Sequence, residues 1–181
     1  MLLLGCRPKG RLTEQHDVFF GLAPSLKDLV PQLNAFWPEA KNSLHIDAWR
    51  EVSSVEGFSI RVVEKAGSPE KEQKDQLFFL NLGGYKANEF EEYHYKLLTV
   101  APNMPEAIQT AKQTSFYKHT GFKGAASHVD DKYGLDVDDV HLVSDLLSPA
   151  VKERYSLEIS PGKKPEDELH LGYLPAWKIK D

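Results

Sequence analysis

The order of apolar and polar positions predicts the same elements twice along the chain. Two apolar runs separated by a glycine-containing loop predict two strands, and Pro24 stops the second of them. Apolar residues then recur at helical spacing, at Leu26, Leu29, Val30, Leu33, Phe36 and Trp37. Two more strands follow. The predicted strands are 2–5, 15–23, 44–52 and 58–63 in the first block, and 77–82, 93–101, 127–131 and 140–146 in the second.

Both predicted helices carry a start signal. Ser25 with Asp28, and Asn103 with Glu106, have the spacing of a capping box. Pro31 lacks a backbone N–H and strains the turn before it. The first helix is therefore expected to start late or to kink.

The two blocks are related in sequence as well as in pattern. Shifting residues 1–34 by 78 positions gives seven identities, where background usage would give about two. The identical pairs are Leu2/Leu80, Leu4/Leu82, Gly5/Gly83, Glu14/Glu92, His16/His94, Ala23/Ala101 and Pro24/Pro102. After an insertion, His45-Ile46-Asp47 matches His128-Val129-Asp130, and Val55-Glu56 matches Val137-Asp138. This similarity predicts an α+β protein of two tandem β-β-α-β-β repeats that form a pseudo-twofold domain with mostly antiparallel sheets.

The chain divides into four predicted segments. The first repeat covers 1–66, a charged linker covers 67–76, and the second repeat covers 77–147. The extension 148–181 matches neither repeat, and its apolar runs at 155–159 and 168–174 predict a C-terminal β-hairpin around a polar loop. This hairpin is expected to cover an exposed sheet edge.

Composition and charge exclude several classes of protein. Of the 181 residues, 41% are hydrophobic, which is too many for a disordered chain. The formal net charge of −5 argues against nucleic-acid binding, which requires a basic surface. No apolar run approaches the roughly 20 residues that span a membrane. A single cysteine excludes an intrachain disulfide, so a cytoplasmic location is expected.

Histidines and carboxylates recur at matching places in the two blocks. Side chains two positions apart on a strand share a face, and His45 and Asp47 are expected opposite the apolar face of their strand, together with Trp49. The predicted binding residues are Glu14, His16, His45, Asp47, Trp49, Glu92, His94, His128 and Asp130. Imidazole and carboxylate groups are ligands of divalent transition metals, and His45, Asp47, His128 and Asp130 are the candidate ligands.

Two function classes remain open, and whether the chain is an enzyme is not decided by the sequence. The first, which we favour, is a non-catalytic module that binds a small ligand or another protein, with the repeated polar groups as a hydrogen-bonded scaffold. The second is a metal-dependent hydrolase with Glu14 or Glu92 as general base. The enzyme requires Glu14, His16, His45 and Asp47 to converge on one point, whereas the module does not.

Several stretches together resemble the bacterial family called domain of unknown function 1543, over roughly residues 1–147. They are Gly5-Cys6-Arg7-Pro8-Lys9-Gly10, Glu14-Gln15-His16-Asp17-Val18, Leu44-His45-Ile46-Asp47-Ala48-Trp49, Leu82-Gly83-Gly84-Tyr85 and His128-Val129-Asp130-Asp131. The resemblance implies a small bacterial cytoplasmic protein and brings no activity, substrate or cofactor. Because two fused copies imitate a dimer, further pairing into a homo-oligomer through free sheet edges is also considered.

Overall fold

The computed structural model describes residues 1–65, 73–85, 88–113, 135–162 and 165–179. The described residues form three sheets, and every strand pair in them is antiparallel. The first sheet has the order β10 (His170–Pro175), β3 (His45–Trp49), β1 (Leu2–Cys6), β2 (Gln15–Phe19). The second is β4 (Ser54–Val55), β5 (Phe58–Glu64), β9 (Tyr155–Pro161), and the third is β7 (Glu92–Ala101), β6 (Gln76–Tyr85), β8 (Leu135–Leu142). The predicted α+β class with mostly antiparallel sheets is confirmed.

The helices are short, and their starts follow the local sequence. They are η1 (Lys27–Leu29), α1 (Val30–Phe36), η2 (Pro38–Ser43), α2 (Met104–Lys112), α4 (Val143–Leu146), α5 (Pro149–Arg154) and η3 (Ala176–Lys178). The late start predicted from Pro31 is confirmed, because α1 begins at Val30 and Pro31 falls in its first turn, where its missing N–H breaks no helical hydrogen bond. At α2, the Asn103 side chain accepts a hydrogen bond from the Glu106 N–H (3.0 Å), as its capping-box spacing predicts.

One predicted strand of the second block is wrong in part, and another is not described. The strand expected at 140–146 ends at Leu142, and the chain continues as α4. Val143, the first residue of α4, and Leu147, which directly follows it, are both buried in one apolar core, so the helical turn is held there by packing. The strand expected at 127–131, with His128 and Asp130, lies outside the described residues.

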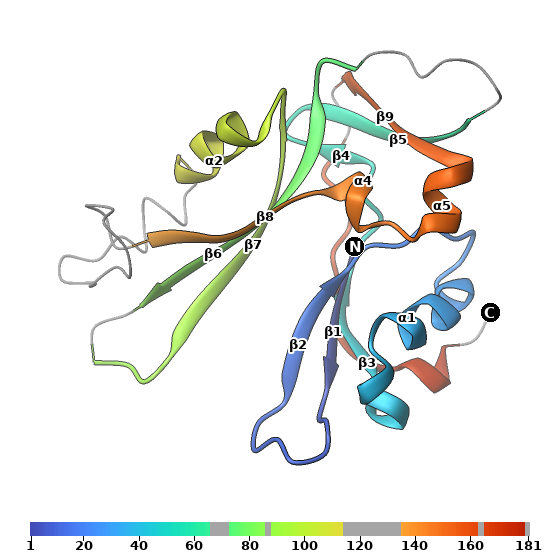
Figure 1. The fold of residues 1–181 in the computed structure, drawn as a ribbon, viewed down its shortest axis with the longest axis vertical. Coiled ribbons are helices and arrows are strands. Elements are labelled where there is room, and N and C mark those ends of the chain that lie inside the picture. Colours follow the sequence, from blue (N-terminus) through green and yellow to red (C-terminus); the bar gives the residue numbers. More distant parts are fainter. Residues whose placement is uncertain (66–72, 86–87, 114–134, 163–164, 180–181) are drawn as a thin grey trace.

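Three apolar cores hold the sheets together. The outer face of the first sheet packs against α1 and η2 through Leu2, Leu4, Leu33, Ala40 and Ile46. The outer face of the third sheet packs against α2 through Phe78, Leu80, Leu82, Ala107 and Ala111. Figure 1 shows the β1–β2 and β6–β7 hairpins diverging from one another, with α1 and α2 on their far sides.

The opposite faces of the first and third sheets, which we call the inner faces, meet in the central core. Phe20, which follows β2, contacts Phe79 of β6 edge to face, with ring centroids 5.4 Å apart. The other buried members of this core are Val55, Ile60, Leu77, Leu98, Val143 and Leu147. Because side chains alternate along a strand, polar residues farther along β2 and β7 on the same faces lie beyond this apolar contact.

The predicted C-terminal hairpin is wrong, although both of its strands exist. β9 pairs with β5 and β10 pairs with β3, so the two strands belong to different sheets. Each strand satisfies the backbone groups along an edge that would otherwise be exposed, which is the edge-covering role expected for this segment. The connection between them is fixed by Asp167, whose carboxylate accepts hydrogen bonds from the Ser53 N–H (3.0 Å), the Ser53 hydroxyl (2.7 Å) and the Ser54 N–H (3.2 Å).

Candidate functional site

Four predicted site residues of the first block converge above Gly5 on the inner face. Gly5 of β1 pairs with His16 on one side and with His45 on the other. Nε2 of His45 lies 3.1 Å from Glu14 and 3.5 Å from Asp47, and Nε2 of His16 lies 3.2 Å from Asp47 and 3.7 Å from Glu14. Two imidazoles and two carboxylates therefore form a closed ring of contacts, which we call the first cluster.

A β-bulge between β1 and β3 places Asp47 in this cluster. Leu4 pairs with Ile46 but Leu3 pairs with Ala48, so Asp47 is an extra residue without a partner in the β1 register. A bulge shifts the alternation of side chains by one position. As a result, the prediction that Trp49 shares the face of His45 is wrong: Trp49 packs with the outer-face core and stacks on His170, with ring centroids 3.9 Å apart.

His45 is the most constrained member of the first cluster. Its side chain is 3% exposed, and the Tyr173 ring lies against it, with centroids 4.4 Å apart. Nδ1 lies 2.9 Å from the Ser43 carbonyl oxygen, which can only accept, so Nδ1 carries the proton. In the neutral ring the lone pair is then on Nε2. Among the described residues, neither this atom nor the buried Oδ2 of Asp47 has a hydrogen-bond partner.

Glycine is required beneath the first cluster because the side chains come close to the backbone. A Cβ atom on Gly5 would lie 2.3 Å from Nε2 of His45 and 2.6 Å from Oδ2 of Asp47. Both distances are far below van der Waals contact. The glycine shared by the two blocks therefore has a steric role at this position.

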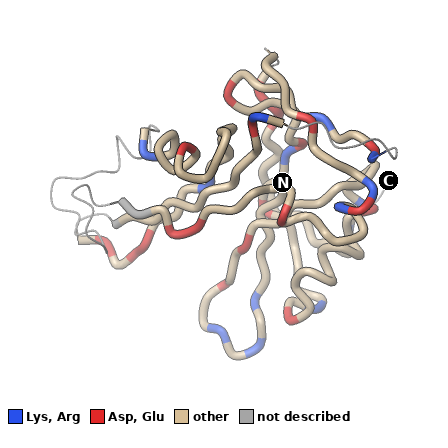
Figure 2. The backbone as a smooth tube through the Cα atoms, turned by 45° about the horizontal axis from the view of Figure 1, so that its top comes forward, with Lys and Arg blue, Asp and Glu red and all other residues tan. Residues whose placement is uncertain are grey.

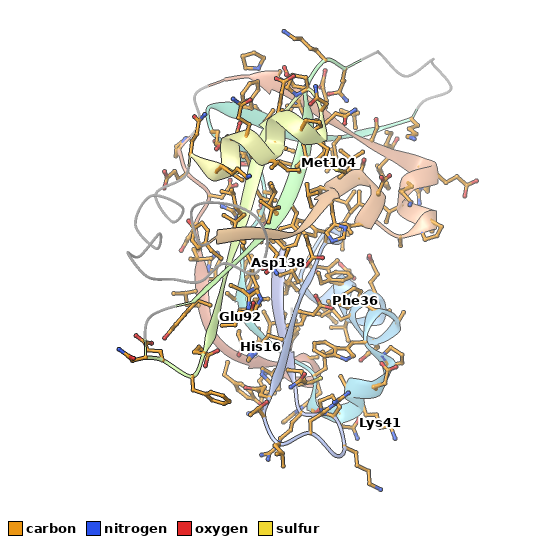
Figure 3. All side chains as sticks on the ribbon, turned by 60° about the vertical axis from the view of Figure 1, so that its left-hand side comes forward. His16, Phe36, Lys41, Glu92, Met104 and Asp138 are labelled. Atoms are coloured by element: carbon orange, nitrogen blue, oxygen red, sulfur yellow. The ribbon has the colours of Figure 1, made fainter. Side chains whose placement is uncertain are left out.

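A second cluster, formed by Glu92, His94 and Asp138, has the same relation to Gly83. Nε2 of His94 lies 3.4 Å from Asp138 and 3.9 Å from Glu92, and a Cβ on Gly83 would lie 2.3 Å from Oδ2 of Asp138. Figure 3 shows Glu92 and Asp138, like His16, apart from both Phe36 of α1 and Met104 of α2.

The sequence comparison missed Asp138 because it aligned this residue with Glu56. The β6–β8 pairing has its own bulge, where Leu82 pairs with Val137 and Asn81 with Asp139, so Asp138 is the extra residue, as Asp47 is in β3. The sequence gives little signal for this equivalence: aligning Asp47 with Asp138 adds only the like pair Ile46 and Val137. The previously matched His128 and Asp130 lie outside the described part of the chain.

In the part of the chain that the structure describes, no group of three or more His, Cys, Asp or Glu side chains is positioned, as it stands, to hold a metal ion. The atoms of the first cluster are at ion-pair distances from each other. Glu14 and His16 are 44% and 42% exposed, so these two side chains have room to adjust, whereas His45 does not.

A cavity of about 470 Å³ lies apart from both clusters, beside the central core. Most of its lining is apolar and includes Phe20, Leu29, Trp49, Ile60, Val62 and Leu157. Arg50 and Glu51 contribute charged groups to the wall. Trp49, predicted as a binding residue of the polar site, lines this cavity.

Comparison with known proteins supports the fold and the family. The crystal structure of a protein Il1583 from Idiomarina loihiensis matches with a TM-score of 0.63 and 22% sequence identity, over 97% of this chain and 94% of that chain. No curated protein matches the sequence. None of the described helices is long and apolar enough to cross a membrane. Residues 11–62 match the model of the Domain of Unknown Function DUF1543, so the family inferred from the sequence motifs is confirmed over this stretch.

Proposed function

We propose that this protein is a metal-binding module in which Glu14, His16, His45 and Asp47 hold one transition-metal ion of the Zn²⁺ or Ni²⁺ type. The observation that carries the proposal is the buried Nε2 of His45, which makes no hydrogen bond to the described residues although carboxylate oxygens of Glu14 and Asp47 lie 3.1 and 3.5 Å away. Leaving such an atom unsatisfied costs about 1–3 kcal/mol. A cation between this atom and the facing carboxylates satisfies all of them at once.

The first cluster would have to rearrange its two carboxylates to surround a metal ion. Zn²⁺ binds nitrogen and oxygen ligands at about 2.1 Å, which places tetrahedral ligand atoms about 3.4 Å apart. The four contacts in the cluster range from 3.1 to 3.7 Å and use both oxygens of each carboxylate, so one oxygen of Glu14 and one of Asp47 would turn toward the ion. The Ser43 carbonyl orients the His45 ring by accepting a hydrogen bond from Nδ1, as backbone carbonyls commonly do for metal-bound imidazoles.

The ligand set favours binding over catalysis. Four protein ligands complete a tetrahedral site, whereas catalytic zinc sites keep one position for water or substrate. The four side chains converge as a hydrolase would require. In the proposed site, however, Glu14 is a metal ligand and is not available as the general base of the hydrolase hypothesis. The module is therefore the function that this geometry supports best.

We also infer that the two clusters descend from one duplicated unit. The support is the shared arrangement of a β-hairpin, a third strand with a bulge at the same register, and a glycine beneath the carboxylate. Our proposal that two tandem repeats form a pseudo-twofold domain rests on this correspondence between the two clusters.

The test is metal binding by tag-free protein that has been stripped with chelator and titrated with Zn²⁺ and Ni²⁺. We expect one tightly bound ion per chain, lost in His45→Ala and in Asp47→Asn. His170→Ala is the matched control, because His170 lies on β10 and stacks on Trp49 outside the cluster. Free ion at 100 times Kd should add about 2.7 kcal/mol of stability, a rise in Tm of roughly 5–10 °C. Equal binding by wild type and His45→Ala would refute the proposal.

The cavity supports a second candidate function, binding of a small apolar molecule. Its volume of about 470 Å³ and apolar walls are typical of small-ligand sites. Val62 lines the cavity and is half exposed, so Val62→Trp should fill it without unfolding the chain. We expect wild type to enhance the fluorescence of an apolar probe such as ANS, and Val62→Trp to lose this effect while Val63→Trp, on the neighbouring position of β5, retains it.

A further inference from the structure

We infer that this protein forms a two-fold dimer in which strand β10 pairs with β10 of a second copy, in antiparallel orientation and centred on Gly172. The first sheet of one subunit then continues into the first sheet of the other. The inference goes beyond the proposed function and does not rest on it, because β10 contributes no side chain to the first cluster.

The outer edge of β10 is open. β10 is the last strand of the first sheet, and β3 is its one pairing partner among the described residues. An edge strand of this kind presents a row of backbone N–H and C=O groups that a further strand can bind. Residues 169–177, which include the whole of β10, contain no Asp, Glu, Lys or Arg. Charged side chains, which commonly protect an edge strand from pairing, are therefore missing here.

The other sheet edges in the described part of the chain are short, charged or covered. β4 has two residues. β2 contains Asp17, β7 contains Lys96 and β8 contains Asp139. Figure 2 shows acidic positions toward the free end of the third sheet, to which β7 and β8 belong. The free edge of β9 is occupied by the Gln73 side chain, which hydrogen-bonds to the backbone of two residues of that strand. This contrast favours β10 as the edge that binds a partner.

Apolar side chains on β10 are exposed on the inner face of the first sheet. Tyr173 lies on this face, because its ring is against that of His45, with centroids 4.4 Å apart. Side chains two positions apart on a strand share a face, so Leu171 lies beside Tyr173. Leu171 is 75% exposed and Tyr173 is 68% exposed. Leu169, just before the strand, and Trp177, just after it, are 57% and 71% exposed.

This apolar surface is complementary to itself under two-fold symmetry. Antiparallel pairing centred on Gly172 places Leu171 of each copy opposite Tyr173 of the other, and pairs of aliphatic and aromatic side chains stabilise neighbouring strands. Gly172 has no side chain, and a Cβ at its position would meet no described atom within 4 Å, so the centre of the pairing is open. Each copy carries a formal net charge of −5, which favours association through a surface without charged groups.

The exposed area is sufficient for a dimer. Large aromatic side chains have about 150–250 Å² of surface, so the four exposed side chains at β10 together present roughly 500–600 Å² in each subunit. An interface of standard size buries about 800 Å² per partner. The apolar side chains supply most of this area, and the backbone along the strand edge adds to it. Because the contact is isologous, each pair of residues occurs twice in the dimer.

Sedimentation velocity of tag-free protein, over a range of concentrations and without added metal, tests the inference. We expect wild type to sediment at twice the mass of the chain. Leu171→Glu and Tyr173→Lys each place a charge against an apolar side chain of the other copy, and each should raise the dissociation constant of the dimer by more than about tenfold. Leu12→Glu is the matched control, because Leu12 is 91% exposed in the β1–β2 loop and should leave the dimer unchanged.

A mixture of the two charged variants tests the register. In a mixed dimer, the introduced carboxylate at position 171 faces the introduced ammonium group at position 173, so the mixture should associate more tightly than either variant alone. Far-ultraviolet circular dichroism shows that each variant is folded. Wild type that stays monomeric, a dimer that survives both substitutions, or a mixture that associates no better than its components would overturn the inference. A monomeric wild type would leave the proposed metal binding intact and the β10 edge available to a strand of a different protein.

Discussion

Gly5→Ala tests whether the close packing above Gly5 is what forms the first cluster. The added Cβ would stand 2.3 Å from Nε2 of His45 and 2.6 Å from Oδ2 of Asp47. Neither group can move away freely. His45 is hydrogen-bonded to the Ser43 carbonyl, and the backbone position of Asp47 is fixed by the bulge in β3. The new methyl group must therefore push the ring out of its buried position.

The size of the effect follows from the contacts that are lost. Displacing His45 breaks the hydrogen bond to Ser43, worth about 1 kcal/mol, and overpacking a tight site costs a further 1–3 kcal/mol or so. Alanine recovers about 0.4–1 kcal/mol by restricting the unfolded chain. The net loss of about 1–3 kcal/mol corresponds to a fall in Tm of roughly 3–10 °C for a domain of this size. Zn²⁺ binding should be lost.

The assay is thermal unfolding with and without Zn²⁺, and Gly162→Ala is the matched control. A Cβ on Gly162 meets its nearest neighbour, Cβ of Ser59, at 3.5 Å, which is ordinary contact. This control should change stability by less than about 1 kcal/mol and keep the Zn²⁺-dependent rise in Tm. A Gly5→Ala protein that melts like wild type and binds Zn²⁺ equally well would refute the steric argument.

Three further predictions concern the rest of the fold. Asp167→Ala should lower the free energy of unfolding by about 2–3 kcal/mol, measured by urea unfolding, because the N–H groups of Ser53 and Ser54 lose a charged acceptor. An unchanged urea midpoint would show that these hydrogen bonds do not stabilise the connection between β9 and β10. The pKa of the Cys6 thiol is raised mainly by burial and further by the carboxylates of Glu14 and Glu39. Cys6 should therefore react with a disulfide reagent only when the chain unfolds. Rapid labelling of the native protein would contradict this prediction. Burial lowers the pKa of the Met1 α-ammonium group from 8.0 to about 6. Between these pH values the unfolded chain binds more protons than the folded chain, so the free energy of unfolding should rise by up to about 2–3 kcal/mol from pH 6 to pH 8. Blocking the amine should remove this pH dependence of stability.

Local sequence patterns were sufficient for the elements that depend on near neighbours. Apolar runs separated by a glycine-containing loop located β6 and β7, and the Asn103–Glu106 spacing located the start of α2. Pro31 fixed the late start of α1. Each of these features is decided within a few residues, by backbone geometry and by which N–H groups need an acceptor.

Features that depend on residues far apart in the chain were predicted wrongly or overlooked. Trp49 was assigned to the wrong face because a bulge reverses the alternation, and a bulge depends on the partner strand. Asp138 was overlooked because its equivalence to Asp47 becomes visible only when β8 is paired with β6. The sequences of β9 and β10 are typical of a hairpin, but β9 pairs with β5 and β10 pairs with β3, at the edges of two different sheets.

The sequence by itself determined the fold class and the duplicated Glu-x-His pattern, and it named Glu14, His16, His45 and Asp47 as candidate site residues. Tertiary structure decided how these groups meet: over a glycine, beside a bulge, with the imidazole of His45 oriented by a backbone carbonyl and left with an unsatisfied nitrogen. The physical reason is the range of the interactions. Alternation and capping act within one turn or strand, whereas strand register, bulges and the burial of a polar atom depend on segments distant in the chain.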